Sequence, residues 1–323
     1  MTVEWRPSAA QEVLQARARF LKKIRAFFEE RGVCEVDTPL LCQYAVTDPH
    51  IDAFEVPVTA ETTYFLQTSP EYAMKRLLAA GSGPIYQMCK AFRRGEVGRL
   101  HNPEFTMLEW YRPLWDHHAL MDEMDAFLNH ILCTPPAERV TYLDLFQQYV
   151  GIDPHTMTVE ALRHVVERQG IMLAGVAAQE DFTRDTYLEL LMSHIIEPHL
   201  GVNGVPTFVH DFPASQSALA KLRRVSEVVY VAERFEVFLE GAEWANGFHE
   251  LTDADEQRAR FVHDQQARQA CGLPFRAIDH RLLAALPQLP HCAGVALGVD
   301  RLFLRWIEKR QLSEVLSFDW LHA

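Results

Sequence analysis

The sequence is poor in basic residues, in closely paired cysteines and in long apolar segments. Its 31 lysines and arginines face 44 aspartates and glutamates, which gives a formal net charge of −13 at pH 7. Proteins that hold nucleic acids usually offer a basic surface to the phosphates, so this charge disfavours a nucleic-acid partner and suits a cationic ligand. The six cysteines include no C-x-x-C pair. This spacing argues against a disulfide framework and against a cysteine-based zinc site.

The sequence also lacks membrane and export signals. No stretch approaches the roughly 18 uninterrupted apolar residues of a membrane-spanning helix. Glu4, Trp5 and Arg6 stand where a signal peptide would be apolar. The composition, 48% apolar and 11% aromatic over 323 residues, is ample for a packed core. We therefore expect a globular protein of the cytoplasm.

Two helices are well bounded in the first third of the chain. Apolar spacings of three, four and seven predict an amphipathic helix over residues 8–31, with a capping box formed by Ser8 and Gln11. A shorter helix is expected within residues 68–81, with Ser69 as its N-cap. Both predictions rest on the capping residues as much as on periodicity.

The remaining pattern predicts strands separated by helical insertions. Strands are expected within residues 33–41, 84–94, 104–112, 206–213, 234–251 and 293–298, and mainly helical structure between residues 116 and about 197. Because helices do not alternate strictly with these strands, they favour an antiparallel sheet with helices packed on it, the α+β class. We expect a single domain over residues 1–323 with a helical insertion at about 114–205.

One hairpin gathers cations beside an acidic and aromatic strand. Its loop holds Arg93, Arg94, Arg99 and His101, and alternation along the returning strand places Phe105, Met107, Glu109 and Tyr111 on one face. Taken alone, this pattern would also fit a solvated hairpin tip with ordinary surface arginines.

The same hairpin resembles motif 2 of the class II aminoacyl-tRNA synthetases, in the lysyl branch, through F-R and H-N-P-E-F-T-M-L-E. G-V-C-E-V-D-T-P is similar to motif 1, which builds a dimer interface around Pro39, and G-V-A-L-G-V-D-R-L is similar to motif 3. The lysyl-like hairpin G-A-E-W-A-N-G-F-H-E-L lies between them. The resemblance covers residues 8–313 and implies a class II catalytic domain that uses ATP and Mg²⁺ to form an aminoacyl adenylate, and that forms a homodimer.

The resemblance implies roles at the nucleotide. Arg93 and Arg301 would be catalytic: Arg93 would clamp the α-phosphate and the substrate carboxylate, and Arg301 would sandwich the adenine against Phe105. Glu236 and Glu243 would hold Mg²⁺, although two surface glutamates would look the same in the sequence. The other residues that it implies at ATP are Arg94, Gly95, Asn102, Trp244 and Gly298.

It also implies an amino-acid pocket. A buried side-chain ammonium must meet carboxylates or hydroxyls, and Glu250, with Tyr111 and Glu109, matches the lysyl pattern for this group. An acidic residue such as Glu71 in a first helical turn also simply favours the helix dipole. The residues that would bind the substrate's amino and carboxylate groups are Ser69, Pro70, Glu71 and Asn246.

Three departures from the lysyl-tRNA synthetases narrow the expectation. No anticodon-binding domain fits before the helix that opens motif 1. The loop reads F-R-R-G-E rather than F-R-N-E, which leaves the role of Glu96 open, and Ala296 stands where glycine is usual. One methyl group in a tight pocket is worth roughly 1–3 kcal/mol of discrimination. All three features fit the stand-alone elongation factor P–(R)-β-lysine ligases, which the chain resembles over its whole length.

That resemblance implies elongation factor P as the acceptor, (R)-β-lysine or lysine as the amino acid, and no tRNA. Other readings stay open. The chain could be a truncated lysyl-tRNA synthetase-like enzyme that activates L-lysine, an asparagine-synthetase-like paralogue, or a non-catalytic synthetase-like regulator. Glu250 with Tyr111 argues against an acidic substrate, which would need a cation in the pocket.

Overall fold

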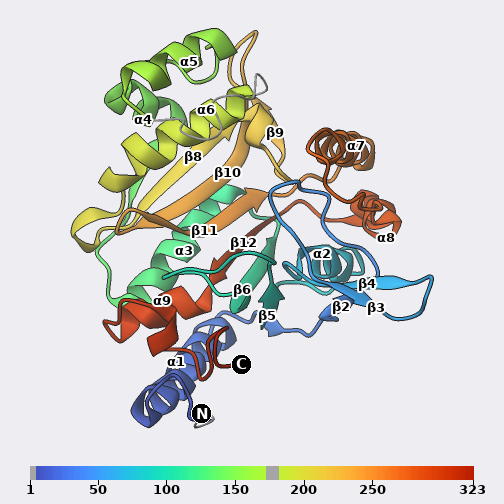
Figure 1. The fold of residues 1–323 in the computed structure, drawn as a ribbon, viewed down its shortest axis with the longest axis vertical. Coiled ribbons are helices and arrows are strands. Elements are labelled where there is room, and N and C mark those ends of the chain that lie inside the picture. The colour runs from blue at the N-terminus through green and yellow to red at the C-terminus, as the bar shows by residue number, and fades with distance from the viewer. Residues whose placement is uncertain (1–4, 172–181) are drawn as a thin grey trace. The chain divides into compact units, whose positions relative to one another are not determined.

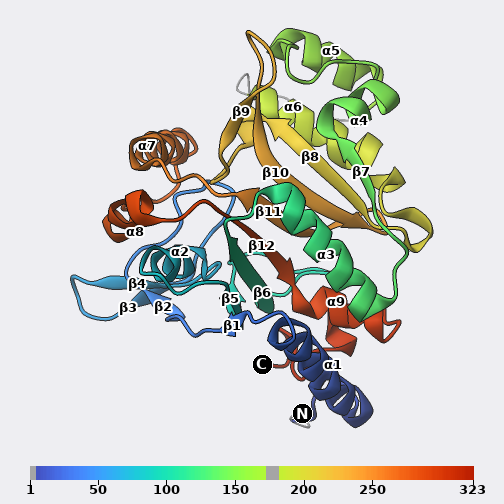
Figure 2. The ribbon, with the colours of Figure 1, turned by 180° about the vertical axis from the view of Figure 1, so that it is seen from behind.

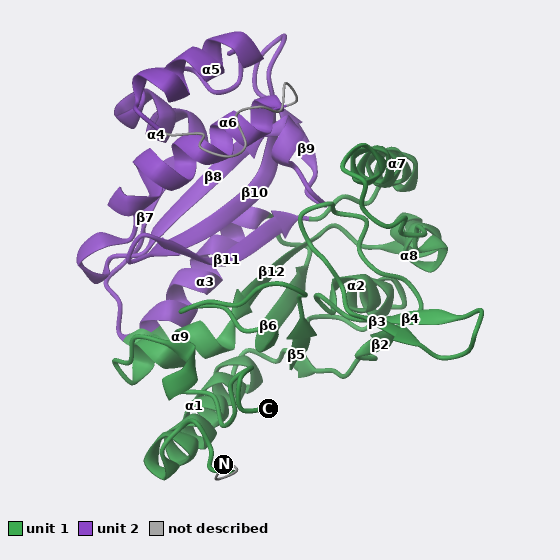
Figure 3. Cartoon of the chain, in the orientation of Figure 1, with its two compact units in different colours: residues 1–116, 130–132, 250–323 green, residues 117–129, 133–249 purple. Residues whose placement is uncertain are grey.

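The computed structural model describes residues 5–171 and 182–323. The chain divides into two compact units (Figure 3). Unit 1 comprises residues 1–116, 130–132 and 250–323, and unit 2 comprises residues 117–129 and 133–249. The single domain expected over residues 1–323 stays a prediction.

Unit 1 contains a strand ladder that carries most of the predicted motifs. Its strands are β1 (Cys34–Glu35), β5 (Ile85–Phe92), β6 (Glu104–Pro113) and β12 (Cys292–Gly298), in that order. β5 and β6 form the predicted long antiparallel hairpin, and β12 runs antiparallel to β6. A separate small sheet has β4 (Thr63–Leu66) between β2 (Leu41–Cys42) and β3 (Glu55–Pro57). The strand expected over residues 33–41 is therefore shorter than predicted.

The helices of unit 1 are α1 (Gln11–Glu29), α2 (Glu71–Ala79), α7 (Ala254–Ala270), α8 (His280–Ala285) and α9 (Val299–Trp306). α1 buries one apolar face, and its Phe28 ring stacks on Tyr86 with centroids 4.4 Å apart. The two ends of the described chain lie beside each other (Figure 1), where Ser8 N donates to Ser317 O at 2.8 Å.

Two predicted helix starts are wrong. α1 begins at Gln11 after Ala10, and no side chain caps it. The Ser8 hydroxyl instead accepts from the backbone N–H of Asp319, because the C-terminal segment returns to this end of the helix. α2 begins at Glu71 with Pro70 in the N-cap position, although the Ser69 hydroxyl still accepts from Glu71 N at 3.1 Å.

Unit 2 has its own ladder, ordered β11 (Ala242–His249), β10 (Tyr230–Leu239), β8 (Thr207–Pro213), β7 (Glu138–Thr141), with β9 (Leu222–Arg224) also paired to β10. The predicted second hairpin is present as β10 and β11, and Glu240 and Gly241 turn it with positive φ angles of 55° and 72°. β7 lies in the region predicted to be mainly helical. Its four residues pair with β8, far along the chain, so local periodicity did not reveal it.

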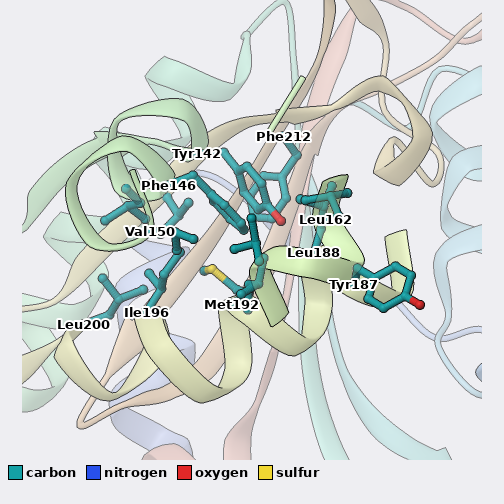
Figure 4. Packing of buried hydrophobic residues seen from close by; sticks show 14 of the residues in the cluster. Tyr142, Phe146, Val150, Leu162, Tyr187, Leu188, Met192, Ile196, Leu200 and Phe212 are labelled. Atoms are coloured by element: carbon teal, nitrogen blue, oxygen red, sulfur yellow. The ribbon is translucent and has the colours of Figure 1, made fainter. Parts of the chain in front are cut away.

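Helices cover both faces of the unit 2 strands. They are α3 (His117–Leu132), most of which belongs to this unit, α4 (Tyr142–Tyr149), α5 (Val159–Arg168) and α6 (Arg184–Leu191), which continues as a π-helical turn at Met192–Ile196. α3 lies on the opposite face from α4 and α6 (Figures 1 and 2). The apolar core between α4, α5, α6 and the strands is shown in Figure 4 and includes Tyr142, Phe146, Leu162, Leu188 and Phe212.

The helical insertion expected at about 114–205 is mainly helical apart from β7, and its residues 172–181 lie outside the described part. Short 3₁₀ turns occur at residues 197–199, 202–204, 214–216, 286–288 and 312–314. Among the described helices, none has the length and apolar character needed to cross a membrane.

Candidate active site

A buried acidic cluster forms where α2 meets β6 in unit 1. The Tyr111 hydroxyl donates to Glu109 Oε1 at 2.6 Å, and the Ser69 hydroxyl donates to Glu109 Oε2 at 2.8 Å. Lys75 Nζ lies 2.7 Å from Glu71 Oε1 and 2.6 Å from Glu250 Oε2. Five of the predicted amino-acid-pocket positions, with Glu109 among them, therefore lie in one cluster.

Lys75 was not predicted from the sequence. Its side chain is 1% exposed and is the cation that two of the three carboxylates share. Burial lowers its pKa, but the charges and hydrogen bonds of Glu250 and Glu71 outweigh burial and raise it overall. Lys75 is therefore charged, and three carboxylates around one ammonium leave the cluster with an excess of acidic groups.

Burial sets the protonation of the acidic groups. It raises the pKa of Glu109 to about 7, with a further contribution from the charge of Glu71. Burial likewise raises the pKa of Glu250 to about 8, against the opposing effect of Lys75. These two carboxyl groups thus titrate near neutral pH. A bound cationic ligand would favour their ionised forms.

The floor of this cluster is a strand of small residues. In the register of β6 and β12, Gly294 lies opposite Tyr111 and Ala296 lies opposite Glu109. A Cβ placed on Gly294 would lie 2.2 Å from Tyr111 Cε1 and 2.7 Å from Glu250 Oε1. Only glycine fits this position, which sequence reasoning missed although the glycine lies inside the motif 3 run. Ala296 lies beside the cluster, where its methyl group was predicted to act.

The predicted nucleotide residues of motif 2 occupy the adjoining hairpin. The Arg93 guanidinium lies 5.3 Å from the Phe105 ring centroid, and its Nη1 is 3.8 Å from Glu96 Oε1. Glu96 is therefore an ion-pair partner of Arg93 in this structure. Arg94 binds the carboxylate of Asp52 through its side chain and the Asp52 carbonyl through its backbone N–H.

Two further predicted nucleotide residues have structural tasks in the loop. Gly95 has a φ of 86°, the left-handed region that favours glycine. The Asn102 side chain donates to Glu104 O at 2.6 Å and accepts from the backbone N–H of Trp320 at 3.0 Å. Asn102 thus joins the hairpin loop to the C-terminal segment.

Arg301 is positioned by a buried anchor that the sequence did not reveal. Asp300, 2% exposed, accepts from Thr106 N at 2.7 Å and pairs with Arg17 at 2.6 Å. This anchor fixes the start of α9 against β6 one residue beyond Phe105, so Phe105 and Arg301 come from neighbouring elements as predicted. Arg301 donates to the Leu100 carbonyl at 3.0 Å.

Gly298, at the end of β12, is not required by protein packing. An added Cβ would meet only the Arg301 side chain, at 3.9 Å and beyond. The space over this glycine is open, as the predicted close approach of a nucleotide requires.

The predicted metal residues lie on the β10–β11 hairpin of unit 2. Burial raises the pKa of Glu236 to about 8; Arg234 lowers it, while the charges of Glu243 and Glu197 raise it further. The carboxylates of Glu236 and Glu243 therefore lie close enough to repel each other. A divalent cation would relieve this repulsion, so the donor set fits Mg²⁺.

Arg234 organises this hairpin and was also missed. Its guanidinium pairs with Glu236 and donates to Asn246 Oδ1 at 3.1 Å. Asn246 and Glu236 face each other in the strand register. The indole N–H of Trp244 donates to the Leu239 carbonyl at 2.8 Å, so this predicted nucleotide residue closes its own hairpin.

Comparison with known proteins identifies the family of the chain. The profile of the tRNA synthetases class II (D, K and N) matches residues 1–320. The chain belongs to this family. The class II assignment accounts for the mostly antiparallel strands with flanking helices, so the predicted α+β class is confirmed.

Eight curated proteins that are similar to the chain over nearly its whole length carry one name. Proteins named elongation factor P--(R)-beta-lysine ligase from Hamiltonella defensa and Mannheimia succiniciproducens are each 49% identical to the chain over 320 residues, covering 97% of both chains. The protein of that name from Photorhabdus laumondii is 50% identical over 324 residues and 98% of both chains. The predicted resemblance to these ligases is confirmed.

Proposed function

We propose that this chain activates (R)-β-lysine with ATP and transfers the β-lysyl group to a lysine side chain of translation elongation factor P. In the first step a carboxylate oxygen of the amino acid bonds to the α-phosphorus and pyrophosphate leaves. In the second step the acceptor's amine bonds to the acyl carbon and AMP leaves. The names of relatives about 49% identical over nearly the whole chain support this activity.

The observation that carries the choice of a lysine-like substrate is the buried cluster of Glu71, Glu109 and Glu250. Its three carboxylates lie around one lysine of the protein, with the Tyr111 hydroxyl as a further partner. A ligand ammonium placed here gains partners that water would otherwise supply. The same cluster would reject a ligand that carries a side-chain carboxylate.

Arg93 and Arg301 would act on the anions of the reaction. Arg93 lies over Phe105 and would hold the α-phosphate and the substrate carboxylate in line, since its planar fork suits bidentate contact. Arg301 and Phe105 would hold the adenine between them. Glu236 and Glu243 would hold Mg²⁺, which supplies charge neutralisation at the phosphate oxygens. Ser69, Pro70, Glu71 and Asn246 would orient the amino acid, and Arg94, Gly95, Asn102, Trp244 and Gly298 would line the nucleotide.

A homodimer through motif 1 is part of the proposal. Leu40 and Leu41, beside Pro39, expose 39% and 41% of their surface. A hollow of about 510 Å³ lies at the same place. Its lining is mixed, with Pro39, Leu77 and four alanines beside the polar Asp37, Thr38, Arg76 and Gln288. Apolar side chains around a hollow are suited to a second copy of the chain.

We place the enzyme in the cytoplasm, where its acceptor takes part in translation.

The test compares both lysine isomers and both acceptors. We expect ATP–pyrophosphate exchange to be at least about tenfold stronger in kcat/KM with (R)-β-lysine than with L-lysine, since one methyl group in the pocket is worth this much. Purified elongation factor P should then gain the mass of one β-lysyl group. Elongation factor P with its acceptor lysine replaced by arginine is the matched control. Label from β-lysine that appears on tRNA and leaves the factor unmodified would overturn the proposal.

A further inference from the structure

Two buried histidines and a glutamate gather in unit 2, outside the candidate active site. They are His117, Glu233 and His249, and their candidate ligand atoms all lie within 4.8 Å of one another. His117 is 1% exposed and His249 5% exposed, and the Glu233 side chain is 12% exposed. His249 Nδ1 lies 2.6 Å from Glu233 Oε2. The sequence indicates none of this, because Glu233 lies 116 positions after His117.

The backbone fixes two members of this triad before any ligand binds. Glu233 lies on β10 and His249 ends β11, next to the register pair Arg234 and Phe248. The backbone of Lys221 holds both: its N–H donates to the His249 carbonyl at 2.8 Å, and its carbonyl accepts from Glu233 N at 2.9 Å. His117 comes from a third element, the first residue of α3.

The triad is separate from the proposed Mg²⁺ residues. Side chains alternate along a strand, so Glu233 and Arg234 point to opposite faces of β10. Arg234 pairs with Glu236 and lies over the Phe212 ring, on the face of the apolar core. The triad therefore lies on the other face, which α3 covers (Figure 2).

We propose that His117, Glu233 and His249 form a binding site for a divalent transition-metal ion, with Zn²⁺ as the best match. Two imidazoles and one carboxylate are a familiar zinc ligand set that leaves a fourth position for water. Ligand atoms at about 2.0–2.2 Å from a tetrahedral ion lie about 3.3 Å apart. The ligand atoms now lie within 4.8 Å of one another, so side-chain rotations need to change the distances between them by about 1.5 Å or less to close the site around the ion.

The surrounding charges are mixed and leave the carboxylate available. Arg223 Nε lies 3.5 Å from Glu233 Oε1, but the same guanidinium also pairs with Asp211 at 2.7 Å. Glu233 Oε2 points to His249, and an ion would take the place of the proton between them and release it to water. The ring of His118, an exposed residue, lies 4.1 Å from that of His117 and marks the side open to solvent.

A bound ion would tie α3 to the β10–β11 hairpin, which also carries Glu236, Glu243 and Asn246. Any ligand that binds only the folded chain raises its stability. The expected consequence is a metal-dependent rise in the melting temperature of about 2–5 °C at an ion concentration well above the dissociation constant.

The experiment titrates Co²⁺ into the full-length chain without a histidine tag and follows the visible absorption of a tetrahedral complex, with Zn²⁺ as competitor. One ion per chain should bind. His117→Gln and His249→Gln should each weaken binding by at least about tenfold, because even the loss of an outer partner of a metal ligand costs this much. His164→Gln is the matched control, since His164 is an imidazole of the same unit with an 80% exposed side chain.

Two results would overturn the proposal. The first is a wild-type chain that shows no stoichiometric Co²⁺ or Zn²⁺ binding at micromolar concentrations. The second is full-affinity binding by a folded His117→Gln chain, or equal loss in His164→Gln, which would assign the ion to surface histidines. Should His249→Gln fail to fold, the wild-type and His117→Gln titrations still decide. Circular dichroism checks the fold of each variant.

Discussion

At the residue scale, the cluster around Lys75 combines specificity with a stability cost. A buried ion pair is held together because removal of either partner leaves an uncompensated charge. Lys75 therefore keeps Glu71 and Glu250 in place, while the carboxylate of Glu109 is held by the hydroxyls of Ser69 and Tyr111. Glu109 is the group best placed to respond to a ligand ammonium.

Gly294 is the residue whose replacement should damage this cluster most directly. In Gly294→Ala the new methyl group would overlap the Tyr111 ring and crowd Glu250. We expect a loss of about 1–3 kcal/mol in unfolding free energy, typical of overpacking, and a fall of at least tenfold in kcat/KM for the amino acid. Urea denaturation and pyrophosphate exchange measure the two effects.

Gly298→Ala provides the control, because its methyl group would have room. It should leave the unfolding free energy within about 0.5 kcal/mol of wild type. Any activity that it loses should appear in the KM for ATP. A Gly294→Ala chain that matched wild type in both assays would show that β12 does not press on the pocket.

Ligand affinity should depend on pH. The pKa of Glu109 is raised to about 7 and that of Glu250 to about 8, whereas a lysine-like ammonium stays charged below about pH 10. As pH rises from 6 to 8.5 the pocket gains negative charge, so the affinity for (R)-β-lysine should rise by at least about tenfold. Calorimetric titration measures it. Glu109→Gln should flatten the profile, and a wild-type affinity that fell over this range would contradict the assignment.

At the element scale, helix α9 reaches its place through one buried carboxylate. Asp300 joins the start of α9 to the backbone of β6 at Thr106 and to Arg17 of α1. Arg17 also donates to the Thr106 hydroxyl at 2.9 Å. Three elements thus share one network. Arg301 is the residue after Asp300, so the network also positions Arg301.

Asp300→Ala should therefore destabilise the chain and misplace Arg301. Breaking a buried ion pair costs about 3–5 kcal/mol, because Arg17 and the Thr106 N–H lose their partner. The midpoint of urea denaturation measures this loss, and the KM for ATP reports on Arg301. In the double variant with Arg17→Met the two losses should be clearly less than additive. Additive losses would show that the pair is not coupled.

The hairpin of β10 and β11 shows how one element serves two purposes. One face carries Arg234, Glu236 and Asn246, and the other carries Glu233 and His249. Strand alternation allows this division. Substitution of the residues on one face should leave the residues on the other face in place. Variants of the two faces therefore test the proposed Mg²⁺ residues and the proposed transition-metal site separately.

At the scale of the whole molecule, several buried acids make stability depend on pH. Burial raises the pKa of Glu109, Glu236 and Glu250 above the ordinary 4.5. The folded chain thus holds these protons more tightly than the unfolded chain does, and the stability they contribute is lost as pH rises through about 7 to 8.

The unfolding free energy should accordingly fall between pH 6 and pH 9, by at least about 1 kcal/mol. Urea denaturation at a series of pH values measures this slope. Glu109→Gln removes one titrating group and should make the slope shallower. A stability that stays constant or rises over this range would contradict the raised pKa values of these carboxyl groups.

The net charge of −13 is the other property of the whole chain that bears on function. A tRNA partner would have to approach a chain of the same net charge sign, and this repulsion grows as salt falls. A protein acceptor requires no such basic surface. The charge therefore supports the protein acceptor of the proposal and is also compatible with a cationic amino acid.

The sequence alone determined the family, the α+β class and the two functional hairpins, because these depend on local signals. Alternation placed Glu109 and Tyr111 on one face, and the glycines and Asn-Pro marked the loops. The capping box at Ser8 was wrong, and β7 within the mainly helical region was missed, for one reason: a distant segment supplied partners that outweighed the local pattern.

Only the tertiary structure decided which distant residues share a site. Lys75, Gly294 and Asp300 acquire their roles from contacts across 44 to 283 positions of the chain, and the sequence carries no periodicity for such contacts. The pKa values of Glu109 and Glu250 belong to this level too, since burial and neighbouring charges set them. The His117, Glu233 and His249 triad exists for the same reason: folding, and not spacing, brings its ligand atoms together.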